Sequence, residues 1–236
     1  MHIARPFGFI AIDKPAGITS HTCVNRLRRI YGIKKVGHGG TLDPAVTGVL
    51  PIALGKATRL LPFMPSTKTY IGIIQLGQET TTDDLHGEVL SKSDWPKFIP
   101  SELDKVLDHF RGEINQIPPQ VSSVHIKGER AYIRARRGEF MEIAPRSINI
   151  FELCLLNWDQ DLGQITLKVH CSSGTYIRAL ARDIGINIGC GGCLSQLRRT
   201  QALGFEESEA EKLPEIEQGD SKYIPPIYSV ETALSH

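Results

Sequence analysis

Residues 37–48 read GHGGTLDPAVTG, a stretch too rich in glycine for a helix or strand and too apolar for a surface linker. It predicts an ordered loop whose glycines let the backbone of a ligand approach closely. Pro44 disfavours the helical conformation of Asp43, so the Asp43 carboxylate is held on a defined extended or turn backbone. Such a loop can present a reactive side chain, although an aspartate that only caps the next turn has the same Asp-Pro signature.

The segments on either side of this loop predict a mixture of strands and helices. Residues 7–12 predict a strand, and Thr19 or Ser20 caps a helix whose apolar residues recur at helical spacing up to Tyr31. Further strands are predicted at 69–76 and 164–171, with further helices at 176–184 and after a Ser101 cap. The elements follow without a regular βαβ repeat, which predicts an α+β fold rather than a doubly wound sheet.

Composition indicates a globular protein with charges gathered in patches. The 236 residues include 27 Lys and Arg against 26 Asp and Glu, a formal net charge of +1, and 41% are hydrophobic. A chain of this kind can bury enough apolar surface to fold. Residues 1–59 carry nine basic and two acidic residues, whereas residues 204–220 carry one basic and seven acidic residues. Local basic patches can attract a polyanion despite the balanced total.

Several classes of protein are excluded at this stage. A membrane-spanning helix needs about 20 apolar residues, which the sequence does not contain, and the N-terminus lacks a secretory signal core. The five cysteines are scattered and odd in number, which is atypical of a secreted disulfide framework. We therefore expect a cytoplasmic protein with reduced thiols. Cys190 and Cys193 have zinc-knuckle spacing but no second close ligand pair, so a glycine turn with small buried side chains is predicted there.

Two short motifs suggest nucleotide or ester chemistry but are incomplete. The GKAT at 55–58 resembles the end of a phosphate-binding loop, but Ala57 stands where that loop needs Ser or Thr. The HGG at 38–40 resembles the oxyanion segment of an esterase, but the chain has no G-x-S-x-G nucleophile turn. We therefore expect no cofactor and no metal.

Several segments in order, spread over residues 7–204, resemble the TruB family of tRNA pseudouridine synthases. They are IDKP at 12–15, GITS at 17–20, GHGGTLDP at 37–44, GVLP at 48–51, KTY at 68–70, QIPP at 116–119, CSSGTYIR at 171–178 and LRRT at 197–200. The resemblance implies a pseudouridine synthase fold, with a mixed, mostly antiparallel sheet flanked by helices and loops. It also implies a catalytic domain over 1–204, an RNA-clamping insertion at about 120–143, and a short acidic segment at 205–236 instead of a complete PUA domain.

The resemblance implies that the chain isomerises uridine-55 in the T arm of tRNA, without a cofactor. Asp43 would be the catalytic carboxylate, as a nucleophile or as the base that takes a ribose proton. Arg178 would keep Asp43 ionised, and Asp84 would hold Arg178 from the other side. Tyr70 would stack on the flipped uracil, with its hydroxyl near the C5 proton.

The remaining implied residues contact RNA. His38 would fill the space vacated by the flipped base, and Tyr176 and Leu197 would form pocket walls. Basic side chains would bind the RNA backbone at Lys14, Arg130 and Arg134. The implied partner is tRNA, and we expect a monomer that binds neither DNA nor a membrane.

Two other functions compete with this interpretation. A noncatalytic RNA chaperone could keep the tRNA-binding surface, although the presence of Asp43, Tyr70 and Arg178 together argues against it. A glycosidase that uses Asp43 and Asp84 as paired carboxylates would release free uracil. Analysis of the products separates the three.

Overall fold

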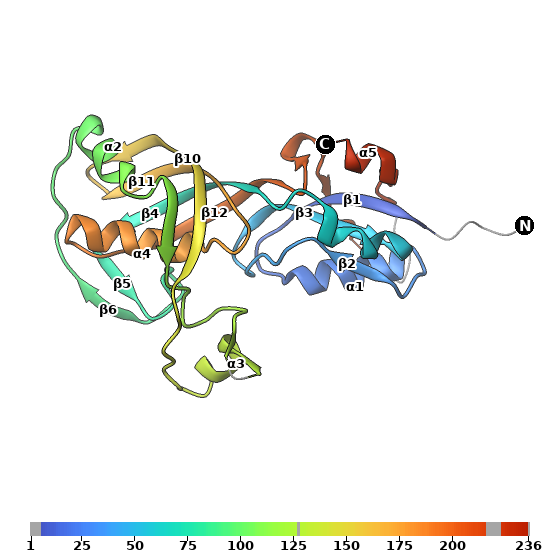
Figure 1. The fold of residues 1–236 in the computed structure, drawn as a ribbon, viewed down its shortest axis with the longest axis horizontal. Helices are drawn as coiled ribbons and strands as arrows, with labels where there is room; N and C mark the ends of the chain where they lie inside the picture. The colour runs from blue at the N-terminus through green and yellow to red at the C-terminus, as the bar shows by residue number, and fades with distance from the viewer. Residues whose placement is uncertain (1–5, 127, 216–222, 236) are drawn as a thin grey trace, which may run out of the picture. The chain divides into compact units, whose positions relative to one another are not determined.

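The computed structural model describes residues 6–126, 128–215 and 223–235. The chain divides into two compact units, one of residues 1–70 and 197–236 and the other of residues 71–196 (Figure 1). Strands β4 (Lys68–Leu76) and β12 (Gly192–Ala202) each contain residues of both units.

The first unit is organised around two buried antiparallel strands, β1 and β3. Gly8 pairs with Leu54 and Lys14 with Gly48, so β3 pairs with β1 over the whole length of β1. Strands β14, β1, β3 and β12 follow one another in that order, with β14 parallel to β1 and β12 parallel to β3. The elements are β1 (Gly8–Lys14), β2 (Val36–His38), β3 (Thr47–Leu54), β13 (Phe205–Glu206), β14 (Glu211–Lys212), α1 (Ser20–Ile30), α5 (Val230–Leu234) and the 3-10 turns η1 (Gly55–Arg59), η2 (Leu61–Phe63) and η3 (Glu207–Glu209).

Helix α1 begins where the sequence predicts it. Thr19 is the N-cap, and its hydroxyl oxygen accepts a hydrogen bond from the Thr22 N–H at 3.0 Å. The helix buries Cys23, Val24 and Leu27 on one face. The predicted helix from Thr19 or Ser20 is therefore confirmed.

The second unit contains an antiparallel sheet with helices α2 and α4 in contact with each other. Strand β11 alternates buried and half-buried residues, as its predicted pattern requires. Strands β4, β11, β10 and β7 follow in that order. The elements are β5 (Gln78–Thr80), β6 (Val89–Lys92), α2 (Pro100–Asp108), β7 (Gly112–Gln116), β8 (His125–Ile126), β9 (Glu129–Arg130), α3 (Ala131–Ala135), β10 (Arg146–Asp159), β11 (Gln164–Cys171) and α4 (Ile177–Ile188).

The α+β class with a mixed, mostly antiparallel sheet is confirmed. The predicted Ser101 cap is wrong, because α2 begins at Pro100 after the N-cap Ile99. Proline fits the first helical position, and the Glu102 carboxylate accepts a hydrogen bond from the Ile99 N–H at 3.1 Å. The expected insertion at 120–143 contains β8, β9 and α3, and Figure 1 shows α3 on a segment that leaves the sheet. The domain boundary at 204 stays a prediction.

The cysteine turn is confirmed. Cys190 and Cys193 are buried, and Gly189 and Gly191 adopt positive φ angles of 90° and 73°. Within the described ranges, no three His, Cys, Asp or Glu side chains gather in a way that could hold a metal. No helix there is long and apolar enough to cross a membrane.

Candidate functional site

The loop that carries Asp43 joins β2 to β3 and is fixed by backbone hydrogen bonds. The N–H of Gly39 donates to the Pro51 carbonyl at 2.8 Å, and the N–H of Val46 donates to the Asp43 carbonyl at 3.1 Å. The Pro44 carbonyl accepts a hydrogen bond from the N–H of Gly17 at 2.9 Å. The loop is ordered, as predicted, and Asp43 occupies an exposed position on it.

Lys14 lies beneath this loop and is completely buried. Its ammonium donates to the carbonyls of Pro15 and Ile18 at 2.8 Å each and of Pro44 at 3.1 Å. Burial lowers the pKa of Lys14, and the nearby Asp43 carboxylate opposes part of that effect. Lys14 was expected to contact RNA, but here its three hydrogen bonds tie the turn after β1 to the residue that follows Asp43.

A second buried cation, Arg199 on β12, holds the two ends of the same loop. Its Nε donates to the Val49 carbonyl at 2.8 Å and its Nη2 to the Gly40 carbonyl at 3.2 Å. Gly48 has a φ of +104°, and a Cβ there would lie 2.1 Å from the Arg199 carbonyl oxygen. The loop thus closes against β12 because residue 48 has no side chain.

Tyr70 and His38 lie close to the Arg199 guanidinium. Tyr70 is 7% exposed, and a side-chain hydrogen bond joins it to Arg199. Burial and the positive charge of Arg199 lower the pKa of His38, with His21 adding a smaller effect in the same direction. His38 is therefore neutral at pH 7, and its Nδ1 accepts a hydrogen bond from the Gly40 N–H at 3.4 Å. Leu197, the remaining predicted site residue of this unit, is half-buried on β12.

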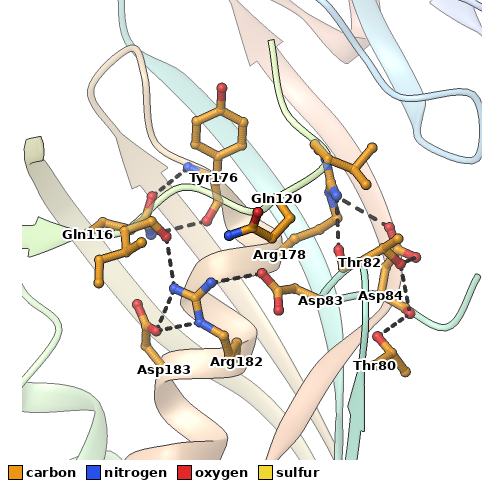
Figure 2. A network of polar contacts seen from close by, with 12 residues as sticks. Thr80, Thr82, Asp83, Asp84, Gln116, Gln120, Tyr176, Arg178, Arg182 and Asp183 are labelled. Atoms are coloured by element: carbon orange, nitrogen blue, oxygen red, sulfur yellow. Dashed lines mark hydrogen bonds and ion pairs between the residues drawn. The ribbon is translucent and has the colours of Figure 1, made fainter. Parts of the chain in front are cut away.

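The second unit places Arg178 and Asp84 together, as predicted (Figure 2). Arg178 lies in the first turn of α4, and its Nε is 3.7 Å from an Asp84 carboxylate oxygen. Its Nη1 donates to the Thr82 carbonyl and its Nη2 to the Val121 carbonyl, both at 2.9 Å. The Asp84 carboxylate also accepts hydrogen bonds from the Thr82 hydroxyl at 2.7 Å and the His86 N–H at 3.0 Å. The side chains of Arg178 and Asp84 are 9% and 19% exposed.

Tyr176 is the N-cap of α4 and is held through its backbone. The completely buried Gln116 side chain accepts a hydrogen bond from the Tyr176 N–H at 2.8 Å and donates to the Tyr176 carbonyl at 3.1 Å. The aromatic ring lies under the Arg146 guanidinium, whose carbon is 5.9 Å from the ring centroid. This backbone anchor fixes the position from which the Tyr176 ring projects (Figure 2).

The two predicted RNA-binding arginines of the insertion differ in their surroundings. Arg130 is exposed and donates to the Ser123 carbonyl at 3.2 Å. Arg134 is partly buried, and its Nε donates to the Glu139 carboxylate at 2.7 Å. Glu139 also binds Arg137, whose side chain pairs with Glu129 as well. The charge of Arg134 is thus balanced within the protein, and Arg130 presents the more accessible cation.

Comparison with known proteins identifies the family. The family model of the TruB pseudouridylate synthase N-terminal domain matches residues 28–177, and that of the tRNA pseudouridylate synthase B C-terminal domain matches residues 178–235. The chain belongs to the TruB family. A tRNA pseudouridine synthase B of Parasynechococcus marenigrum (strain WH8102) is 63% identical over 96% of this chain and 78% of the relative. One of Prochlorococcus marinus (strain MIT 9313) is 62% identical over 98% of this chain and 72% of the relative.

Solved structures share the fold of this chain. A chain of a Cbf5-Nop10-Gar1 complex is 32% identical to this chain, with a TM-score of 0.68 over 88% of its length. A chain of an H/ACA ribonucleoprotein bound to a substrate RNA containing 2′-deoxyuridine is also 32% identical, with a TM-score of 0.64. This chain spans about half the length of each, 52% and 51%. The predicted family, the fold and the tRNA pseudouridine synthase activity are confirmed, and the roles of individual residues stay predictions.

No role is predicted from the sequence for three side chains that contact the loops around the predicted site residues. Arg199 stands within the TruB-like segment LRRT, and Gln116 within QIPP. Arg182 lies within residues 176–184, which are predicted as a helix. A buried arginine and an exposed one look alike in sequence. The alternation of β12, which buries Arg199 and leaves Arg198 half-exposed, was the available signal.

Proposed function

We propose that this chain converts uridine-55 in the T arm of tRNA to pseudouridine, with Asp43 as the catalytic carboxylate. The observation that carries the proposal is that buried side chains hold the loop bearing Asp43 in place in a TruB-family chain. Two buried cations, Lys14 and Arg199, bind carbonyls at residues 40, 44 and 49 around Asp43. A loop held in this way presents its side chain with little reorganisation during the reaction.

The reaction is an isomerisation in which every atom is accounted for. The bond between ribose C1′ and uracil N1 breaks, the uracil turns, and a bond forms between C1′ and C5. The C5 proton leaves and N1 gains a proton, so no redox partner or external group is consumed. Asp43 either attacks C1′ or takes the proton from C2′. A deuterium label at C2′ distinguishes the two routes, because only the second breaks the bond between C2′ and its hydrogen.

Arg178 is the proposed cation that keeps Asp43 ionised during this reaction. A guanidinium remains charged at all physiological pH values and offers paired donors to a carboxylate. Asp43 is exposed in the chain alone, so we propose that the bound RNA excludes water from it. Tyr70 would contact the flipped uracil, His38 would fill its vacated place, and Tyr176 and Leu197 would bound the pocket.

Three further features of this proposal concern binding and location. The insertion would hold the T arm, with Arg130 contacting RNA phosphates. The protein would act as a monomer, because one chain supplies every residue that the resemblance assigns to the reaction. It would work in the cytoplasm.

The test uses a tRNA transcript tritiated at uridine C5. We expect the chain to release one tritium per tRNA, and mapping to place the pseudouridine at position 55. An Asp43→Asn variant should release tritium at least a thousandfold more slowly, because the amide can neither attack C1′ nor accept the 2′ proton. Asp13→Asn is the matched control, since Asp13 lies in the same unit and pairs with Arg198 at 3.0 Å. That control should keep nearly full activity.

Other outcomes would favour the competing functions. Release of free tritiated uracil from the tRNA would indicate a glycosidase. Faster folding of tRNA without any tritium release would indicate a chaperone. Undiminished modification by Asp43→Asn would contradict the role of Asp43, and a transcript with cytidine at position 55 that still loses tritium would contradict the proposed target.

A further inference from the structure

Arg182 makes a set of contacts that the proposed reaction does not use. It lies one helical turn after Arg178 on the same face of α4, and its side chain is 22% exposed (Figure 2). Its Nη1 donates to the Asp83 carboxylate at 2.8 Å, and its Nη2 donates to the Ile117 carbonyl at 2.8 Å. Its Nε donates to the adjacent Asp183 carboxylate at 2.9 Å, which orients the guanidinium. Each of the three guanidinium nitrogens of Arg182 therefore has a partner in the protein.

The partner of Arg182 in the 80–84 loop has an unusual backbone. Asp83 has a φ of 60°, in the left-handed region that a non-glycine residue rarely occupies. This conformation aims the neighbouring side chains at different arginines, Asp83 at Arg182 and Asp84 at Arg178. Burial raises the pKa of Asp83, while Arg182 and Arg178 favour its ionised form. The strained turn is thus stabilised by the two cations of α4.

Arg178 and Arg182 bridge the same two segments. Arg178 binds the Thr82 and Val121 carbonyls, and Arg182 binds Asp83 and the Ile117 carbonyl. One segment carries Asp84, and the other leads into the expected RNA-clamping insertion. A displacement of residues 117–121 would therefore reach the Asp84 loop through two guanidinium groups. These paired contacts connect the base of the insertion, which is expected to bind RNA, to Arg178.

We propose that Arg182 is a positioning residue for pseudouridine formation, coupling the base of the insertion to the Asp84 loop and thereby orienting the Arg178 guanidinium. This inference rests on the proposed function. It assigns Arg182 no contact with the substrate. Its loss should slow the chemical step on bound tRNA and leave the affinity for tRNA nearly unchanged.

The experiment measures single-turnover tritium release at saturating tRNA, together with the tRNA Kd and the thermal midpoint. Arg182→Gln should slow release about tenfold, or about 1.4 kcal/mol, while the Kd changes less than threefold. Arg182→Lys should lose about threefold, because one ammonium can bind Asp83 or the Ile117 carbonyl but cannot reproduce the fork. An unchanged rate for Arg182→Gln, or a loss confined to the Kd, would overturn the inference.

Arg111→Gln is the matched control for loss of a bridging arginine in the same unit. Arg111 binds the Leu153 carbonyl at 2.7 Å and Asp104 at 2.6 Å, between α2 and β10. This control should keep its rate. Equal slowing in both variants would show a general loss of structure and overturn the coupling. An inactive wild-type chain would contradict the proposed function itself, so the two failures are distinguishable.

A double-mutant cycle provides a second, independent measurement. Asp83→Asn removes the other partner of the ion pair and should slow release to a similar degree. The double variant Asp83→Asn with Arg182→Gln should be no slower than either single variant, because both changes break the same link. Losses that multiply would show that the two residues act separately and would contradict the proposal.

Discussion

At the residue scale, the first unit uses two buried cations to stabilise the backbone of the loop that carries Asp43. Transferring a charge into a protein interior costs several kcal/mol unless hydrogen bonds compensate for the lost water. Lys14 and Arg199 obtain these bonds from carbonyls around the Asp43 loop. Because loop carbonyls rarely have regular partners, the cations and the loop satisfy each other. The hydrogen bonds to the loop carbonyls thereby offset the cost of burying the two charges.

Replacement of Arg199 should therefore destabilise the protein. Arg199→Met leaves the Gly40 and Val49 carbonyls without these donors, and we expect the free energy of unfolding in urea to fall by about 2–4 kcal/mol. Arg198→Met is the matched control on the adjacent residue. Arg198 is 33% exposed and pairs with Asp13 and Glu207, so its loss should cost less than about 1 kcal/mol. Equal losses in the two variants would contradict the role of Arg199.

His38 should make stability depend on pH. Its pKa is lowered in the folded protein, so as the pH falls below about 6.5 the unfolded chain binds a proton before the folded one. The stability contributed by neutral His38 is present above that pH and is lost as the pH falls towards the lowered value. Between pH 7 and pH 5, His38→Gln should lose about 0.5 kcal/mol less than the wild type in urea unfolding, because partial exposure screens the effect.

The control for this measurement is His109→Gln, which removes an exposed histidine after α2. It should follow the wild-type pH dependence more closely than His38→Gln does. A His38→Gln profile that runs parallel to the wild type would show that His38 carries none of the acid sensitivity.

At the element scale, local signals predicted some elements well and others not at all. The α1 cap and the strand at 164–171 were recognised because Thr19 caps locally and the strand alternates strictly. The long β10 and β12 were missed, because their stability comes from partners distant in sequence. The Ser101 cap failed since a proline at the first helical position and Glu102 replaced the usual side-chain cap.

Gly48 tests how closely β3 and β12 must approach. A Cβ at residue 48 would lie 2.1 Å from the Arg199 carbonyl oxygen, so Gly48→Ala should separate the strands and lower the free energy of unfolding by more than 3 kcal/mol. Gly17→Ala is the control, because Gly17 also has a positive φ, +86°, but no atom lies within 4 Å of its added Cβ. That change should cost about 1–2 kcal/mol. Urea unfolding of both variants measures the difference, and equal costs would mean that the close approach is easily relaxed.

At the scale of the whole molecule, the binding of tRNA should depend strongly on salt. Each neutralised phosphate releases counterions, so the slope of log affinity against log salt reports the number of contacts. Arg130→Gln should reduce the magnitude of this slope by about 0.7–0.9, because Arg130 is exposed. Arg134→Gln should change it less, since Glu139 already pairs with Arg134. Filter binding over a salt series measures both, and a larger change for Arg134 would reverse the assignment.

The candidate site was predicted from the sequence in an uneven way. Asp43, Tyr70 and Arg178 stand in segments whose resemblance to the TruB family is specific. Arg199 holds the loop that carries Asp43, and Gln116 holds the backbone of Tyr176. Both act on backbone groups that only the fold brings near. Lys14 shows the same limit, because the sequence around a buried lysine looks the same as that around a lysine on the surface. The side chains with predicted roles at the substrate could therefore be inferred from the sequence, whereas those that hold the loops could not.

The span between Arg199 and the loop that it holds has a consequence for synthesis on the ribosome. Val49 and Arg199 are 150 residues apart, and the whole second unit is translated between them. The loop bearing Asp43 therefore leaves the ribosome long before Arg199 is synthesised. A contact between residues so distant in sequence forms late in folding. A nascent chain would carry the proposed catalytic carboxylate on an unfinished scaffold, so competence to modify RNA should arrive only after Arg199 has been synthesised.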